Sequence, residues 1–385
     1  MSDQTKPILV AVVGVGLVGA EFVDQLLSLP KEYFQIVALV SSDATLFAAD
    51  GLAIDRSSWK GVYQQSKGPT IISALAAELY ALVNAGRKVV LVDNTAAETV
   101  AHMYPNFLTG GVNVITPNKK AFSSDQELFD SILRATAQGG ARFLNEATVG
   151  AGLPIISTLK DLVATGDTVL FIQYILPSEN KLSRTQVTKI EGVFSGTMSY
   201  IFNNFSTPSS GGPSFSSVVK AARDNGYTEP HPGDDLNGAD VARKLTILSR
   251  MIPVLREALP QGYKSVDTRS LVPPALEGLE TGDQFMSRLP DFDGEFEAVR
   301  AEAQHENKVL RYVGVIDVEK RVVKASLEKY ENAHPFATSL GGSDNIIMFH
   351  TKRYGTRPLI VQGAGAGAAV TAMGVLSDLL KLANR

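Results

Sequence analysis

Apolar positions follow two different periods along the first 144 residues of the chain. Continuous apolar runs predict buried strands at 8–13, 35–40, 89–92 and 112–116. Apolar residues three and four positions apart predict helices at 17–29 and 71–84, and a Ser-x-x-Glu capping box at Ser124 predicts a third helix that ends near residue 138. Strands that alternate with helices predict an α/β fold with a doubly wound, Rossmann-like parallel sheet.

The pattern is different in the second half of the chain. A strand is predicted at 187–193, and an antiparallel hairpin is predicted from 311–317 and 322–327. Helices are predicted at 197–205, 216–225 and 237–252, and a glycine-rich stretch at 361–367 opens a last helix that ends near residue 382. These elements predict a mixed α+β domain after the parallel one.

Composition removes several classes of function. The 385 residues contain no cysteine, which excludes disulfides, thiolate metal sites and a cysteine nucleophile. The five histidines include no pair at metal-ligand spacing. The net charge is −4 without a block of Lys or Arg, so a nucleic-acid partner is not expected. No apolar stretch approaches membrane-spanning length and the first residues are polar, so we expect a cytoplasmic protein with no membrane contact.

A glycine motif follows the first predicted strand and opens the first predicted helix. Gly14 permits the tight turn, Gly16 lets the backbone approach a pyrophosphate, and Gly19 lets the helix pack on the strand. The helix N-terminus supplies N–H groups for phosphates, which brings Val15, Leu17 and Val18 into the expected dinucleotide site.

The sequence distinguishes less clearly between NAD and NADP than it indicates dinucleotide binding. No acid stands directly at the end of the second strand to bind a ribose hydroxyl, and Ser41 and Ser42 could accept a 2′-phosphate. No arginine follows closely. NADP is favoured on this reading, and NAD stays open.

The densest polar stretch runs from Gly226 to Lys244. Asp240 and Lys244 are four residues apart on a predicted helix, so they share one face. One interpretation is a surface ion pair. The other is a preformed site in which Glu229, Asp234 and Asp235 crowd beside a lysine, suited to an amino-acid ammonium and an oxygen that needs a proton.

Two further segments have a possible role in chemistry. Lys119 follows a predicted strand end, where a doubly wound sheet faces its cofactor crevice, although surface lysines are common. The small-residue loop from Glu146 to Leu153 could turn carbonyls inward around a hard monovalent cation or simply connect two domains.

Taken together, these motifs resemble homoserine dehydrogenase, in particular its short fungal form, over nearly the whole chain. The resemblance rests on Thr116 to Ala121, Glu146 to Pro154, Gly192 to Thr197, Gly226 to Lys244 and Gln362 to Ala369. It implies reduction of L-aspartate 4-semialdehyde to L-homoserine with NAD(P)H, on the route to threonine and methionine. The alternatives are another lysine-dependent NAD(P) oxidoreductase and a non-catalytic NAD(P)-sensing regulator.

The resemblance also implies roles for single residues. Lys244 would be the proton donor, Lys119 would lie beside the nicotinamide, and Asp240 would orient both the substrate and Lys244. The other matched positions divide into substrate-binding residues (Glu229, Asp235, Thr197), cofactor-binding residues (Asn94, Thr95, Gly226, Gly363) and sodium ligands (Glu146, Val149, Ala151, Leu153).

Domain organisation is implied in the same way. A dinucleotide-binding domain would span 1–153, a substrate-binding domain whose mixed sheet forms a homodimer would span 154–340, and 341–385 would return to the first domain. A regulatory module after Arg385 or a kinase before Met1 is not expected.

Two departures from the family pattern stand out. His231 occupies a position where members often carry an acid. The chain is also longer than the pattern by a segment at 171–186, which is either a hairpin or dimer contact particular to this chain or translated non-coding sequence. In either case we expect it to be dispensable for the chemistry.

Overall fold

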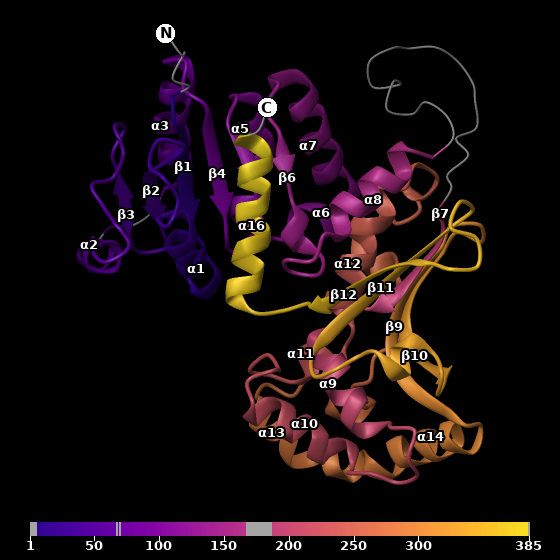
Figure 1. Ribbon diagram of the computed structural model, residues 1–385. Coiled ribbons are helices and arrows are strands. Elements are labelled where there is room, and N and C mark those ends of the chain that lie inside the picture. The colour runs from indigo at the N-terminus through magenta and orange to yellow at the C-terminus, as the bar shows by residue number, and fades with distance from the viewer. Residues whose placement is uncertain (1–5, 67, 69–70, 167–186, 384–385) are drawn as a thin grey trace. The chain divides into compact units, whose positions relative to one another are not determined.

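The computed structural model describes residues 6–66, 68, 71–166 and 187–383 (Figure 1). The segment at 171–186 therefore lies outside the described residues. The chain forms two compact units: residues 1–152 with 367–385, and residues 153–366. Among the described residues, no helix combines the length and the apolar character that a membrane span requires.

The first unit is built on a six-stranded sheet in the order β3-β2-β1-β4-β5-β6. Every neighbouring pair is parallel except β2 and β3, which confirms the doubly wound sheet. Its strands are β1 (Ile8–Val13), β2 (Phe34–Val40), β3 (Thr45–Phe47), β4 (Val89–Asp93), β5 (Asn113–Ile115) and β6 (Phe143–Leu144). The six residues of β1 are all buried, as expected for a central strand covered on both faces.

Eight helices accompany this sheet in the described part of the unit. They are α1 (Leu17–Leu26), α2 (Trp59–Gln65), α3 (Ile72–Asn84), α4 (Glu98–Ala101), α5 (Tyr104–Thr109), α6 (Lys120–Ser123), α7 (Gln126–Gly139) and α16 (Ala368–Ala383). The capping-box prediction was wrong by one residue, because the Asp125 side chain accepts the Leu128 N–H and caps α7. A carboxylate at this position also interacts favourably with the helix dipole.

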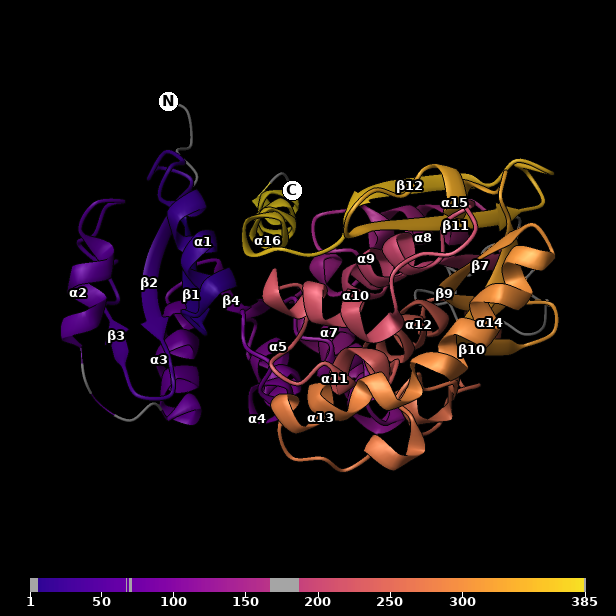
Figure 2. The same cartoon turned by 90° about the horizontal axis from the view of Figure 1, so that it is seen from below.

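The second unit has a six-stranded sheet in the order β12-β11-β7-β9-β10-β8. Its neighbours are antiparallel except for β8 beside β10. The strands are β7 (Val187–Val193), β8 (Asp267–Thr268), β9 (Lys308–Asp317), β10 (Val322–Glu331), β11 (Asp344–Thr351) and β12 (Leu359–Ala364). Figure 2 shows β11 and β12 running side by side.

Helices pack on this sheet and extend from it. They are α8 (Ile155–Ala164), α9 (Gly196–Phe205), α10 (Phe215–Asp224), α11 (Gly233–Leu236), α12 (Ala239–Arg250), α13 (Gly282–Arg288), α14 (Asp293–His305) and α15 (Pro335–Thr338). Leu245 of α12 and Phe194 pack against β9 at Gly314. A Cβ at Gly314 would lie 2.7 Å from the Leu245 side chain and 2.8 Å from the Phe194 side chain. Alternate β9 residues Val313 and Val315 form a separate small core with Phe336.

The end of the chain divides differently from the predicted segment 341–385. Residues 344–364 form β11 and β12, which belong to the second sheet, and the return to the first unit begins at Gly367. From there α16 contributes Ala372, Val375 and Leu379 to the core beneath β1. Gly363 therefore lies near the end of β12, whereas Gly365 and Gly367 lie between β12 and α16.

Candidate active site

The glycine motif of the first unit forms the turn that the sequence predicts. Gly14 follows β1 with a φ of +86°, and Gly16 is the N-cap of α1. A Cβ at Gly19 would lie 1.9 Å from the Gly14 carbonyl oxygen, whereas a Cβ at Gly16 would meet nothing within 4 Å. Gly19 is thus needed for packing, and the space at Gly16 is open to a ligand.

A buried carboxylate organises the neighbouring strand end. Asp93, the last residue of β4, is 0% exposed and accepts hydrogen bonds from the Tyr104 hydroxyl at 2.5 Å, the Thr95 N–H at 2.8 Å and the Asn118 amide at 3.2 Å. Burial raises the pKa of Asp93, and these hydrogen bonds act in the opposite direction. Asp93 therefore fixes Thr95 and the segment that leads to Lys119.

Asn94 and Lys119 lie next to this network. Both polar atoms of the Asn94 side chain are screened from solvent and have no hydrogen-bond partner among the described residues. Buried amides are normally paired, so this one is suited to a bound polar ligand. Lys119 is the N-cap residue of α6, and the Asn118 side chain that precedes it also donates to the Ala97 carbonyl at 3.0 Å. The sequence reading missed Asp93 and Asn118; the signal was an acid that ends an apolar strand.

In the second unit, Lys244 lies on α12 and is only 7% exposed. Its Nζ is 2.7 Å from Asp240 Oδ2 and donates to the Phe194 carbonyl at 2.7 Å. The i,i+4 pair Lys220–Asp224 on α10 provides a contrast, because its side chains are 67% and 59% exposed. Lys244 is therefore not part of a solvated surface pair, although the Asp240 side chain remains 46% exposed.

Asp235 connects the acidic loop to α9. Its carboxylate accepts the Glu229 N–H at 2.8 Å, and Thr197 Oγ1 lies 2.8 Å from Asp235 Oδ1 and 2.6 Å from the Tyr227 carbonyl. Burial raises the pKa of Asp235 to about 6, and the charges of Glu229 and Asp240 act in the same direction. The structure thus brings Thr197, Glu229, Asp235 and Asp240 into one cluster, while Asp234 points to solvent.

Gly226 and His231 shape the same loop. Gly226 follows α10 with a φ of +72°, and a Cβ there would meet nothing within 4 Å. The Gly233 N–H donates to His231 Nδ1 at 3.1 Å, which leaves Nε2 to donate to the Leu279 carbonyl at 3.1 Å. His231 therefore connects this loop to Leu279 through its ring nitrogens.

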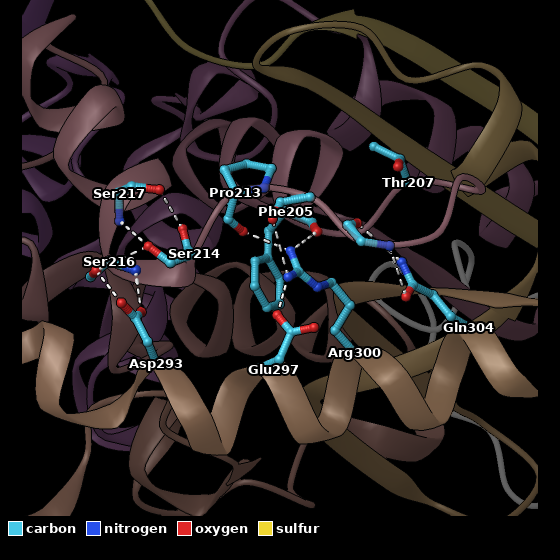
Figure 3. A network of polar contacts seen from close by, with 12 residues as sticks. Phe205, Thr207, Pro213, Ser214, Ser216, Ser217, Asp293, Glu297, Arg300 and Gln304 are labelled. Carbon is cyan, nitrogen blue, oxygen red and sulfur yellow. Dashed lines mark hydrogen bonds and ion pairs between the residues drawn. The ribbon is translucent and has the colours of Figure 1, made fainter.

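The helix that carries Thr197 is held at its other end by two buried arginines. Arg311 donates to the Phe202 and Ser206 carbonyls at 3.1 and 2.9 Å, which satisfies acceptors at the C-terminus of α9. Figure 3 shows Arg300 of α14 directed at the loop after α9, where it donates to the Phe205 and Pro213 carbonyls at 3.1 and 2.6 Å. Both arginines lie far from Thr197 in sequence, and only the structure reveals them.

The remaining predicted residues occupy two further segments. Glu146 and Val149 are buried around a short 3₁₀ turn (Glu146–Thr148), and Ala151 has a φ of +54°. Glu146 Oε2 accepts from Lys381 Nζ at 3.0 Å, and the Glu146 N–H donates to Asp378. Gly363 lies in β12, where a Cβ would approach the Leu153 side chain to 3.0 Å. Within the described residues there is no cluster of three or more His, Cys, Asp or Glu side chains that could hold a metal ion.

Family comparisons match both halves of the chain. A model of homoserine dehydrogenase matches residues 175–380, and a model of the homoserine dehydrogenase NAD-binding domain matches residues 14–146. The homoserine dehydrogenases of Schizosaccharomyces pombe and Saccharomyces cerevisiae are each 44% identical to this chain, over 100% and 99% of it and over 98% and 99% of their own lengths.

Solved structures show the same fold. A Candida auris protein described as of unknown function superposes with a TM-score of 0.86 at 42% identity, covering 99% of both chains. A hyperthermophilic archaeal homoserine dehydrogenase in complex with NADPH superposes with a TM-score of 0.66 over 98% of this chain and 97% of its own. At 17% identity the second likeness concerns the fold alone.

Proposed function

The chain belongs to the homoserine dehydrogenase family, and on that premise we propose which of its residues reduce L-aspartate 4-semialdehyde to L-homoserine with NAD(P)H. The motif resemblance is confirmed, as is the expectation of an NAD(P)-dependent oxidoreductase of amino-acid biosynthesis. What remains to be proposed is the role of each residue.

The first unit holds the dinucleotide in this proposal. The open space at Gly16, the α1 N-terminus and the unpaired Asn94 amide suit a pyrophosphate and a polar nicotinamide end. Val15, Leu17, Val18 and Thr95 complete this set in the first unit, and the family resemblance adds Gly226 and Gly363 as cofactor-contacting positions. When bound, the cofactor supplies the hydride. By resemblance, Lys119, which directly follows the fixed Asn118, would contact the nicotinamide end of the cofactor.

The choice of dinucleotide is proposed from the end of β2. The Ser41 hydroxyl that could bind a 2′-phosphate donates instead to Asp43 Oδ1 at 2.8 Å, and Ser42 lies 3.4 Å from the same atom. A carboxylate accepts a bond from a ribose hydroxyl and repels a phosphate. We therefore propose that NAD(H) supports the reaction at least as well as NADP(H), although the sequence pattern alone favours NADP.

Substrate binding and proton transfer belong to the second unit. Glu229 and Asp240 bind the substrate ammonium, and Asp235 and Thr197 hold the loop that presents Glu229. Lys244 protonates the carbonyl oxygen as the hydride arrives. The observation that carries this role is the buried Lys244 ammonium between Asp240 and the Phe194 carbonyl, because a group held in this way can deliver a proton in a fixed direction.

Sodium at the loop that ends with Leu153 remains a proposal from resemblance. The left-handed Ala151 turns consecutive carbonyls to different sides, which suits main-chain ligands. Because the Glu146 carboxylate is already paired with Lys381 Nζ at 3.0 Å, Glu146 would contribute its carbonyl, together with the carbonyls of Val149, Ala151 and Leu153. Thermal unfolding in NaCl and in choline chloride of equal ionic strength tests it: a higher Tm in sodium is expected, and equal values contradict it.

Assembly and location complete the proposal. We propose a homodimer formed through the second sheet, which sedimentation would show as twice the chain mass, and a cytoplasmic location, which a tagged protein would show by microscopy.

The activity itself is tested by a direct assay. Purified protein with homoserine and NAD⁺ or NADP⁺ at alkaline pH should raise the absorbance at 340 nm. Folded protein that gives no rise with either dinucleotide contradicts the proposed function.

A further inference from the structure

One main-chain carbonyl in the second unit lies between two side-chain donors from distant parts of the chain. The Phe194 oxygen accepts from Lys244 Nζ at 2.7 Å and from Asn345 Nδ2 at 3.0 Å. Phe194 joins β7 to α9, Lys244 lies on α12 and Asn345 lies on β11. Both Phe194 and Asn345 are 0% exposed, so neither group exchanges this contact for water.

The orientation of the Asn345 amide is determined by this contact. Its Oδ1 is buried and has no hydrogen-bond partner among the described residues. A reversed amide would place Oδ1 against the Phe194 oxygen, where two acceptors repel. The amide packs against bare backbone, since a Cβ at Gly365 would lie 2.0 Å from Asn345 Cγ. Nothing else in the described surroundings explains a polar residue here.

Asn345 therefore does not improve the stability of the sheet. It follows Asp344 in a strand that continues with four apolar residues, Ile346 to Phe349. An unpaired buried oxygen is unfavourable relative to an apolar side chain of the same shape. The Phe194 oxygen would still be paired through Lys244 if Asn345 were apolar. The Asn345 amide therefore lowers the stability of the fold, which indicates a role in function instead.

We propose that Asn345 is a positioning residue for proton transfer, because it fixes the Phe194 carbonyl that holds the Lys244 ammonium. The inference rests on the proposed role of Lys244 as proton donor. Asp240 is half-exposed and can move, whereas the Phe194 carbonyl is the buried contact of the ammonium. With Asn345 bound to the same oxygen, the carbonyl cannot rotate away, and the ammonium keeps its direction.

The test compares Asn345→Leu, which has nearly the same shape, with Thr351→Val on the same strand. Thr351 is also buried, at 4% exposure, and its hydroxyl accepts the Tyr354 N–H, far from the Phe194 carbonyl in the ladder. For Asn345→Leu we expect an equal or higher Tm, kcat lower by about tenfold and KM values within a factor of about two, as for the loss of one oriented hydrogen bond. For Thr351→Val we expect a lower Tm and an unchanged kcat.

Two outcomes would overturn the inference. One is a wild-type kcat in Asn345→Leu, and the other is a fall in Tm that accounts for the lost activity. If Asn345→Leu does not fold, Asn345→Ala replaces it, because a smaller side chain fits the same space, and the same split between kcat and KM is required.

A second comparison separates this inference from the proposed function. If Lys244→Ala keeps normal turnover, Lys244 is not the proton donor and its proposed role fails. If Lys244→Ala loses turnover, the double variant Lys244→Ala/Asn345→Leu should have the same residual kcat as Lys244→Ala alone. A further tenfold loss would show that Asn345 acts on another group.

Discussion

In the first unit, the residues proposed to hold the cofactor phosphates lie in one turn, from Gly14 to Gly19. In the second unit, the Lys244 ammonium contacts Asp240 of the same helix and the Phe194 carbonyl between β7 and α9, and that carbonyl also accepts from Asn345 of β11, 101 positions after Lys244. The first arrangement depends on backbone shape and the second on side chains that meet only after folding. Substitutions in the first unit should therefore affect either packing or dinucleotide binding, whereas substitutions in the second unit should lower turnover through the position of one ammonium group.

The largest expected effect concerns Lys244. In Lys244→Ala, kcat should fall by about 10² to 10⁴, the usual contribution of a general acid, while dinucleotide binding measured by fluorescence titration changes little. Lys220→Ala is the matched control, because Lys220 forms the same i,i+4 pair on an exposed helix face. Equal turnover in Lys244→Ala and Lys220→Ala would show that Asp240 and Lys244 form an ordinary ion pair with no part in catalysis.

The glycine turn allows packing and dinucleotide binding to be tested separately. Gly19→Ala should lower the free energy of unfolding by about 1–3 kcal/mol, because the new Cβ overlaps the Gly14 carbonyl. Gly16→Ala should leave the Tm unchanged and raise the KM for the dinucleotide by about tenfold, because the methyl group occupies the space proposed for the pyrophosphate.

Gly61→Ala in α2 is the control for both variants, since a Cβ there also meets nothing within 4 Å. Helix propensity should make it slightly more stable, by about 1 kcal/mol or less, with unchanged kinetics. An unchanged KM in Gly16→Ala would place the phosphates elsewhere.

A smaller effect is expected at Asp43. Asp43→Asn removes the charge that Ser41 and Ser42 contact, so the ratio of kcat/KM for NADPH to that for NADH should rise several-fold. Steady-state assays with both dinucleotides measure it. A constant ratio would mean that this carboxylate does not reach the ribose.

The smallest effect is a pH dependence of stability at Asp235. Burial raises the pKa of Asp235 from 3.8 to about 6, so the folded state binds more protons than the unfolded state between these values. The free energy of unfolding therefore falls as the pH rises through this window. Asp235→Asn lacks the carboxyl, and its Tm relative to the parent should increase from pH 4 to pH 7.

The exposed neighbour Asp234 provides the control for that measurement. Asp234→Asn removes an exposed carboxyl from the same loop, so the difference between the two variants isolates the contribution of the Asp235 carboxyl. A parallel pH dependence in Asp235→Asn and the parent protein would show that the carboxyl of Asp235 is not perturbed.

Sequence reasoning reached the features that local patterns determine. The parallel strands, the glycine turn and the i,i+4 relation of Asp240 and Lys244 follow from spacing, and the structure contains them. The glycine-rich stretch at 361–367 predicts the opening of a helix, whereas hydrogen bonds to β11 make residues 359–364 a strand. Pairing with a distant strand is invisible to local periodicity.

The polar residues that support the site were missed for the same reason. Asp93 ends an apolar strand and Asn345 directly precedes an apolar run, and both positions could have been noted as buried polar candidates. Their partners could not be inferred, because Tyr104 contacts Asp93, and the Phe194 carbonyl contacts Asn345, only through tertiary packing. The pattern already placed Glu229 in a possible acidic site, whereas the role of Thr197 came from resemblance alone.

The C-terminal helix has a consequence for the order of events during synthesis. Ala372, Val375, Leu379 and Leu382 of α16 fill the core of the unit that begins with β1. The ribosome makes the second unit in full before it reaches these residues. The N-terminal unit is therefore the last to complete its core, and until then α1 presents an apolar face that a chaperone can bind. A frameshift or stop codon near the end of the message would damage the beginning of the protein.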